Sequence, residues 1–186
     1  MLILASRSPR RADFLTQLGV AFQQQAADVD ETPLPNELPA DYVIRVAELK
    51  ATTIAAHTEH PVLGSDTAVV IDNDPLGKPE NKAHFQSMME RLSGRCHQVM
   101  TAVSICVHGQ CHSRLVTTSV WVKPLTEQEI NWYWDTGEPQ DKAGGYGIQG
   151  LAGRFIPKID GSYSAVVGLP LYETNELLRE LDIYER

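Results

Sequence analysis

The run of residues 6–11, Ser-Arg-Ser-Pro-Arg-Arg, carries the most reactive mixture of side chains in the chain. Ser8 followed by Pro9 is typical of a helix N-cap and first helical residue, so free backbone amides would lie beside Arg10 and Arg11. Amides at that end of a helix attract anions, and arginine binds phosphate oxygens through two parallel hydrogen bonds. The run predicts a phosphate site, and a solvated basic turn is the alternative.

A single carboxylate, Asp66, interrupts the apolar residues 61–72, which predict a buried strand broken around positions 65–67. Ionised carboxylates are rare in such surroundings unless they cap, pair or bind a metal. Thr67 adds a hydroxyl, and Glu31, in an acidic run after another expected strand, could complete a hard-cation site with Asp66 and several waters. The alternatives are a turn-capping Asp66 and a solvated Glu31.

Two lysines are candidates for the positive charge that phosphoryl chemistry requires. Lys50 shares its expected helix face with the apolar Val43 and Ile54, and Lys78 lies in a Gly-Lys-Pro loop of limited freedom. Inward cations beside an acidic metal site would stabilise charge on a transferring phosphoryl group. Both can equally be surface lysines.

A glycine-rich stretch, residues 136–150, contains five glycines, Tyr146 and Gln149. Long ordered loops of this kind often carry function, although a mobile surface loop is the alternative. The Gln149 amide offers a donor and an acceptor together, so it could pair with the imide edge of a nucleobase while Tyr146 packs nearby.

These candidates need a framework, and the chain predicts one of alternating strands and helices, hence a single α/β unit over residues 1–186. Strands are expected at 2–5, 22–29 and 61–72, and a hairpin from 99–107 and 111–123. Helices are expected from residue 9 to a glycine C-cap at 19, and at 41–56, 81–92, 126–134 and 171–181. Shorter elements are expected at 154–159 and 163–167, and a proline-rich loop at 32–39.

Composition limits the function classes. The 186 residues are 42% hydrophobic and 22% charged, as in an ordinary globular protein, and the net charge of -8 disfavours nucleic acid as the main ligand. No window holds the roughly 20 apolar residues of a membrane span, and the N-terminal order of apolar then charged residues is wrong for a signal peptide. Three cysteines, an odd number, predict reduced thiols and a cytoplasmic protein.

The histidines and cysteines at 96–97 and 106–112 resemble a zinc cluster, but their spacing suits neither a zinc finger nor a zinc ribbon. A Ser-His-Asp nucleophile elbow is likewise without a matching motif. Neither metal binding at the hairpin nor serine catalysis is therefore the expected chemistry.

Over nearly its whole length the sequence resembles the Maf-type nucleotide pyrophosphatases. The resemblance lies in ordered blocks rather than in one motif. The blocks are residues 4–11, 64–67 (Gly-Ser-Asp-Thr), 76–79 (Leu-Gly-Lys-Pro), 92–94 with His97, and 161–163 with 167–170. The block 141–150 is similar to the subgroup acting on dTTP and UTP rather than the one acting on 7-methyl-GTP. Asn81 departs from the acidic residue that the family more often has after Lys-Pro.

The resemblance implies a Maf/ITPase-like α/β fold, with a mixed twisted sheet, flanking helices and two lobes around a deep cleft. It implies hydrolysis of a nucleoside triphosphate to monophosphate and pyrophosphate, a divalent cation (Mg or Mn) and a homodimer, without nucleic acid or membrane partners. An alternative is a nucleotide-binding regulator of septum formation without significant turnover.

Site residues follow from the resemblance position by position. Asp66 matches the catalytic proton acceptor and, with Glu31, the expected metal site. The substrate-binding and specificity positions are Ser8, Arg10, Arg11, Thr67 and Gln149. Lys50 and Lys78 are the expected catalytic cations.

Overall fold

The computed structural model describes residues 1–183, so the last three residues of the expected 1–186 unit lie outside the described part. Within residues 1–183, seven strands form one mixed sheet in the order β2-β1-β3-β5-β6-β7, with β4 paired to β3. The pairs of β1 with β2 and β3 are parallel, and the others are antiparallel. The expected mixed α/β sheet is confirmed.

The elements in chain order are β1 (Leu2–Leu4), α1 (Pro9–Gln17), β2 (Phe22–Gln24), α2 (Pro39–Ala55), β3 (Val62–Ile71), β4 (Asp74–Leu76), α3 (Lys82–Leu92), β5 (Cys96–Val107), β6 (Gln110–Trp121), α4 (Glu127–Asp135), η1 (Glu138–Asp141), η2 (Ala143–Gly145), η3 (Leu151–Phe155), β7 (Lys158–Asp160), α5 (Tyr163–Val167) and α6 (Leu171–Glu180), where η denotes a 3-10 helix.

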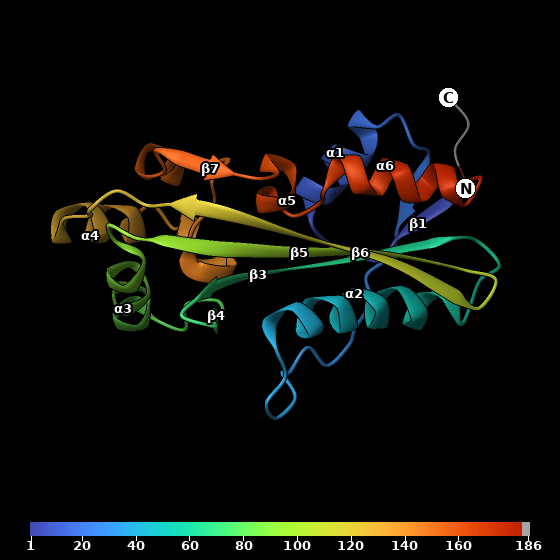
Figure 1. Cartoon of the computed structure of the whole chain (residues 1–186), viewed down its shortest axis with the longest axis horizontal. Helices are drawn as coiled ribbons and strands as arrows, with labels where there is room; N and C mark the ends of the chain where they lie inside the picture. Colours follow the sequence, from blue (N-terminus) through green and yellow to red (C-terminus); the bar gives the residue numbers. More distant parts are fainter. Residues whose placement is uncertain (184–186) are drawn as a thin grey trace.

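Helices cover both faces of the sheet, and long strands connect its two ends (Figure 1). Helix α2 lies on one face, where Val43 and Ala47 pack against Ala68, Val70 and Ala102. Helices α1, α5 and α6 lie on the opposite face, and α3 and α4 lie at the end of the molecule remote from β1. Strands β3, β5 and β6 therefore run from one end of the molecule to the other.

Several helix ends are where local sequence signals predict them. The Ser8 hydroxyl caps α1 by accepting from the Arg11 backbone N–H, and Thr126 with Glu129 forms a capping box on α4. Gly19 follows α1 with φ 72°, as expected of a residue just beyond a helix. Asn81, the departure from the family pattern, caps α3 by accepting from the His84 backbone N–H.

The expected break in the strand around Asp66 is wrong. β3 runs without interruption from Val62 to Ile71, and its ladder with β5 continues through the pair Asp66 and Ala102. The strand stays intact because a side chain from α2, described below, neutralises the buried carboxylate. An uninterrupted strand also alternates its side chains, so Ser65 and Thr67 lie on the face opposite to that of Asp66.

Other boundaries differ by a few residues. β2 ends at Gln24 instead of continuing to residue 29, and α2 begins at Pro39 instead of 41. The element expected at 154–159 is divided between η3 and β7. The hairpin is confirmed, with a two-residue turn at His108 and Gly109, both of which have positive φ.

The prediction of three reduced thiols is wrong for one pair, because Cys106 and Cys111 form a disulfide. They lie directly opposite each other in the β5–β6 ladder, with Cα atoms 4.0 Å apart. The register of the hairpin brings them together, which a cysteine count does not reveal. The cysteines therefore no longer support a reducing compartment.

Two further expectations concern membranes and zinc. In residues 1–183 no helix is both long and apolar enough to span a bilayer. Over the same residues no group of three or more His, Cys, Asp or Glu side chains is placed to hold a metal ion. The cysteine and histidine run at the hairpin thus forms no such cluster.

Candidate active site

One cleft of about 1050 Å³ gathers every site residue expected from the sequence. Its lining comes from the β1–α1 segment, the loop after β2, α2, the middle of β3, the loop after β4, residues 138–150 and the end of α5. The expected residues in this lining are Ser8, Arg10, Arg11, Glu31, Lys50, Asp66, Thr67, Lys78 and Gln149. Segments more than a hundred residues apart in sequence therefore meet in one place.

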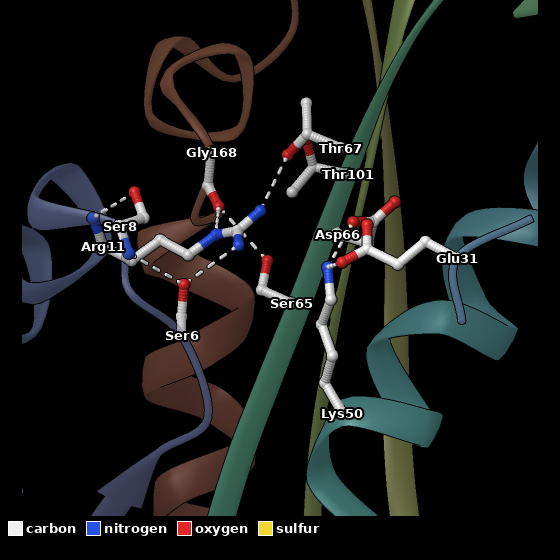
Figure 2. A network of polar contacts seen from close by, with 10 residues as sticks. All are labelled: Ser6, Ser8, Arg11, Glu31, Lys50, Ser65, Asp66, Thr67, Thr101 and Gly168. Atoms are coloured by element: carbon white, nitrogen blue, oxygen red, sulfur yellow. Dashed lines mark hydrogen bonds and ion pairs between the residues drawn. The ribbon is translucent and has the colours of Figure 1, made fainter. Parts of the chain in front are cut away.

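An ionic cluster occupies the α2 side of β3 (Figure 2). The Lys50 Nζ lies 2.8 Å from Asp66 Oδ1 and 3.1 Å from Glu31 Oε1. The side chains of Lys50 and Asp66 are each 10% exposed, whereas that of Glu31 is 49% exposed. Burial raises the pKa of Asp66 above its usual value, while Lys50 and Arg11 oppose that rise.

A glycine makes this cluster possible. A Cβ on Gly64 would lie 2.1 Å from the Ala47 carbonyl oxygen and 2.9 Å from the Ala51 backbone nitrogen, so α2 packs directly on the β3 backbone there. Lys50 lies between these two contact points along α2, and Asp66 is two residues beyond Gly64 on the same face of β3. The close packing of helix on strand thus delivers the ammonium to the carboxylate.

On the other side of β3, Arg11 is held by neutral oxygens (Figure 2). Its Nε donates to the Gly168 carbonyl at 2.8 Å and its Nη1 to Ser6 Oγ at 3.2 Å. Its Nη2 donates to Thr67 Oγ1 at 3.5 Å. Burial lowers the pKa of Arg11, with Asp66 opposing, but a guanidinium remains protonated in a protein. These acceptors orient the positive charge without neutralising it, which suits binding of an anion.

Ser65 and Thr101, to which the sequence assigned no role, support the contacts of Arg11. Ser65 Oγ donates to the Gly168 carbonyl at 3.1 Å, the oxygen that also accepts from Arg11. Thr101 Oγ1 donates to the Ala165 carbonyl at 2.7 Å and lies 3.1 Å from Thr67 Oγ1. The available signals were weak, namely hydroxyls in apolar strands and the Val-Gly-Leu-Pro run at 167–170.

The remaining expected residues lie at the rim of the cleft. Lys78 and Gln149 are exposed, and Arg10 and Ser8 are half-buried. Arg10 lies near enough to Asp141 to lower the pKa of that carboxyl, after the larger effect of its hydrogen bond with Lys142. Arg10 therefore faces the glycine-rich stretch. The Ser8 hydroxyl is engaged in capping α1, with 3.5 Å to the Arg11 nitrogen.

The residues present fit a magnesium or manganese ion that shares its ligands with a substrate. Glu31 and Asp66 both direct a carboxylate oxygen at one ammonium, so the two carboxylates converge. Magnesium is usually bound by one or two carboxylates together with substrate phosphates and waters. Within residues 1–183 no third acidic, histidine or cysteine ligand completes an all-protein site, so substrate oxygens would have to complete it.

Comparison with known proteins gives one family and several close relatives. The family model described as "Maf-like protein" matches residues 1–181. A protein of Pseudoalteromonas translucida called dTTP/UTP pyrophosphatase is 58% identical over 178 residues, which are 95% of this chain and 94% of the relative. Proteins with the same name in Pseudoalteromonas atlantica and Vibrio cholerae are each 53% identical, covering 98% and 96% of this chain and 98% and 97% of the relatives.

Solved structures give more distant similarities. The Ham1 protein of Staphylococcus aureus has a TM-score of 0.47 and 16% identity, covering 65% of this chain and 71% of that one. A nucleoside-triphosphatase, or dITP/XTP pyrophosphatase, of Mycobacterium abscessus has a TM-score of 0.43 and 14% identity, covering 67% of this chain and 74% of that one.

Proposed function

Because the chain belongs to the family of Maf-like proteins, we propose that it hydrolyses dTTP and UTP to the nucleoside monophosphate and pyrophosphate. Relatives called dTTP/UTP pyrophosphatase are 50 to 58% identical to it over nearly its full length. The observation that carries the proposal is the buried Asp66 held by Lys50 in the same cleft as the un-neutralised cation of Arg11. A carboxylate beside a cationic pocket is suited to attack of water on a phosphoanhydride.

In this reaction a water oxygen forms a bond to the α-phosphorus, and the bond from that phosphorus to the α,β-bridging oxygen breaks. The bridging oxygen leaves with pyrophosphate, and Asp66 accepts the proton of the attacking water. Burial supports this role because it raises the pKa of Asp66 and makes the carboxylate a stronger base than a solvated one. Lys50 keeps the carboxylate ionised and oriented through the 2.8 Å contact.

The cations of the cleft would bind the triphosphate and stabilise the charge on the leaving pyrophosphate. Arg11 is oriented for this by Ser6, Thr67 and Gly168. Arg10 and Lys78, which line the same cleft, would add charge from its rim. Ser8 would bind substrate only through the α1 terminus that it caps, where free backbone amides favour anions.

Glu31 and Asp66 would hold the Mg or Mn ion. Such an ion, when bound, lowers the pKa of a coordinated water and neutralises phosphate charge. Lys50 lies between the two carboxylates and would keep them together before substrate binds. Its ammonium thus fixes the spacing of two groups that otherwise repel each other.

Gln149 would select the base. Thymine and uracil present the same imide edge, an N–H between two carbonyls, and an amide side chain pairs with it through one donor and one acceptor. Gln149 is exposed in the lining of the cleft, as a residue that contacts substrate must be. Thr67 and Arg10 would contribute to substrate choice from the opposite part of the lining.

We extend the proposal to the form in which the protein acts, namely one catalytic unit over residues 1–186, assembled as a cytoplasmic homodimer. The continuous sheet supports a single unit, and the net charge of -8 supports the absence of a nucleic acid partner. Nucleoside triphosphates are cytoplasmic metabolites, which supports the location. Light scattering on the purified protein tests the dimer.

The deciding experiment is pyrophosphate release from dTTP, UTP, CTP, ATP, GTP and 7-methyl-GTP with Mg or Mn, comparing the unmodified protein with Asp66→Asn. We expect release from dTTP and UTP and a loss of about 10²- to 10⁴-fold in the variant, the usual contribution of a general base. Asp13→Asn, an exposed aspartate on α1, is the matched control and should keep full activity. Folded protein that binds dTTP but releases no pyrophosphate would instead identify a nucleotide-binding regulator.

A further inference from the structure

We propose that Glu138 and Tyr133 position Gln149 and thereby set the discrimination between bases. The inference rests on the proposed function, because it concerns the residue that reads the base. It assigns a role to two side chains that are not among the expected site residues. The pair is called the Glu138–Tyr133 clamp below.

The clamp holds the chain on both sides of Gln149. The Tyr133 hydroxyl donates to Glu138 Oε1 at 2.7 Å and accepts from the Gly147 backbone N–H at 3.2 Å, two residues before Gln149. Glu138 Oε2 accepts from the Leu151 backbone N–H at 2.9 Å, two residues after it. Glu138 Oε1 also accepts from the Ala152 backbone N–H at 3.4 Å.

Close packing at the next residue shows how tightly the loop is seated. A Cβ on Gly150 would lie 2.4 Å from Glu138 Oε2 and 2.5 Å from Oε1. Only glycine therefore allows the backbone after Gln149 to approach the carboxylate so closely. The Glu138 backbone carbonyl in turn accepts from Lys142 Nζ at 2.7 Å, a contact within the first half of the glycine-rich stretch.

The clamp is anchored in the hydrophobic core through Tyr133, while Glu138 lines the cleft. Tyr133 is fully buried on α4, where its ring packs edge-on against Phe155 with centroids 5.7 Å apart. A phenol so confined has little freedom to follow a moving loop. Burial raises the pKa of Tyr133, and its hydrogen bond to Glu138 raises it further. The hydroxyl therefore keeps its proton and remains a donor.

Gln149 is itself exposed, so the place of its amide depends on the backbone that carries it. Hydrogen bonds weaken steeply with misalignment, and a site built to pair with a polar edge discriminates only while its donor and acceptor stay in place. Loss of the clamp would therefore weaken the reading of the base more than it slows the attack on phosphorus. Glu138 and Tyr133 are positioning residues in this account.

The test is a double-mutant cycle of Tyr133→Phe and Gln149→Ala, with kcat and KM measured for dTTP and CTP. Tyr133→Phe removes one oxygen and keeps the ring in the core. We expect the ratio of kcat/KM for dTTP over CTP to fall about 2- to 10-fold, as for one hydrogen bond, mainly through KM. In the Gln149→Ala background the same change should leave the ratio unaltered. Tyr172→Phe, at a residue 72% exposed, is the matched control.

An equal fall in both backgrounds would overturn the inference, because a purely structural role does not depend on Gln149. Backbone hydrogen exchange gives a readout without turnover, and we expect the amides of Gly147 and Leu151 to exchange faster in Tyr133→Phe. Unchanged exchange would also overturn it.

Affinities for non-hydrolysable α,β-imido dTTP and dCTP separate failure of this inference from failure of the proposed function. If the unmodified protein binds but does not hydrolyse nucleotides, the hydrolytic function is wrong, and the cycle is completed with dissociation constants. A preference for the dTTP analogue that Tyr133→Phe leaves intact would then contradict the clamp. Absence of any nucleotide binding would overturn both.

Discussion

The two ends of the cleft are held together by different interactions. Around β3, full charges lie in buried surroundings, with Lys50 between two carboxylates and Arg11 among neutral oxygens. Around the glycine-rich stretch, the buried partners are neutral phenols. The His97 Nε2 lies 2.6 Å from the Tyr146 hydroxyl, and Tyr133 bridges Glu138 to the loop.

The difference follows from what each end must bind. A triphosphate carries several charges, so its site needs cations, and buried charges are stable only when paired or hydrogen-bonded. A pyrimidine base is neutral, so its site needs a well-placed donor and acceptor instead. We therefore expect substitutions at the charged end to affect both stability and turnover most, and substitutions at the loop end to affect base choice and the dependence of stability on pH.

The largest expected effect is at the charged end, in Lys50→Met. The variant leaves Asp66 buried without its ammonium, which should cost about 3 to 5 kcal/mol of unfolding free energy and about 10²- to 10³-fold in kcat. Urea unfolding measures the change in unfolding free energy, and pyrophosphate release measures the change in kcat. Adding Asp66→Asn should restore stability but not activity.

Lys82→Met is the matched control for this comparison. Its ion pair with Asp135 spans 3.3 Å between side chains that are 43% and 67% exposed. Such a surface pair contributes about 1 kcal/mol or less. Equal losses in the two lysine variants would contradict the account of a buried, functional pair.

Gly64→Ala should have the next largest effect. The added Cβ would meet the Ala47 carbonyl at 2.1 Å, so α2 must shift away from β3 and carry Lys50 with it. Overpacking of this kind costs about 1 to 3 kcal/mol, and we expect the upper part of that range together with a fall in kcat. Ser65→Ala, the next residue on the opposite face, is the comparison. A smaller loss of kcat in Gly64→Ala than in Ser65→Ala would argue against the helix contact.

At the loop end, the buried His97 should make the stability of the protein depend on pH. Burial lowers the pKa of His97 to about 4, whereas a histidine in the unfolded chain has its ordinary pKa of 6.5. Acid therefore protonates the unfolded chain first, and stability is lost as the pH falls from about 6.5 toward about 4. Between pH 7.5 and pH 5 the loss due to His97 should be about 2 kcal/mol.

His97→Gln isolates this contribution, because glutamine can still form a hydrogen bond with the Tyr146 hydroxyl but does not titrate. Urea unfolding at the two pH values should show a loss smaller by about 2 kcal/mol in the variant than in the unmodified protein. Parallel losses in the two proteins would exclude His97 as the source.

The smallest expected effect is that of Thr101→Val. The change keeps the side-chain volume but removes the hydrogen bond to the Ala165 carbonyl and the contact with Thr67. We expect about 1 kcal/mol of destabilisation and a modest rise in KM, because Thr101 supports Arg11 only indirectly, through Thr67. Turnover reduced as far as in Lys50→Met would show that Thr101 acts directly on the reaction.

Much of the fold could be predicted because its signals are local. Ser8 with Pro9 starts α1, Thr126 with Glu129 starts α4, and the His108-Gly109 turn closes the hairpin, each through contacts within a few residues. The ordered blocks that resemble Maf-type enzymes likewise marked most of the polar residues that line the cleft. Their roles in catalysis stay predictions.

What failed depended on partners far away in the sequence. Asp66 was expected to break its strand because its partner Lys50 lies 16 residues away on α2. The sequence predicts Arg11 as a phosphate ligand, which stays a prediction, but does not reveal its hydrogen bond to the Gly168 carbonyl 157 residues away. The Cys106–Cys111 disulfide depends on hairpin register, which one residue of slip would abolish.

By itself the sequence determined the kind of protein this is, with its alternating elements, its helix caps and the residue types available for phosphate chemistry. Local backbone preferences and side-chain periodicity suffice for that. Only the tertiary structure decided how those residues are used, because alternation along β3 sends Asp66 to α2 and Thr67 to Arg11. Packing then selects the partner of each charge and places Tyr133 and Glu138 behind Gln149, since burial and hydrogen bonding depend on neighbours that only folding assembles.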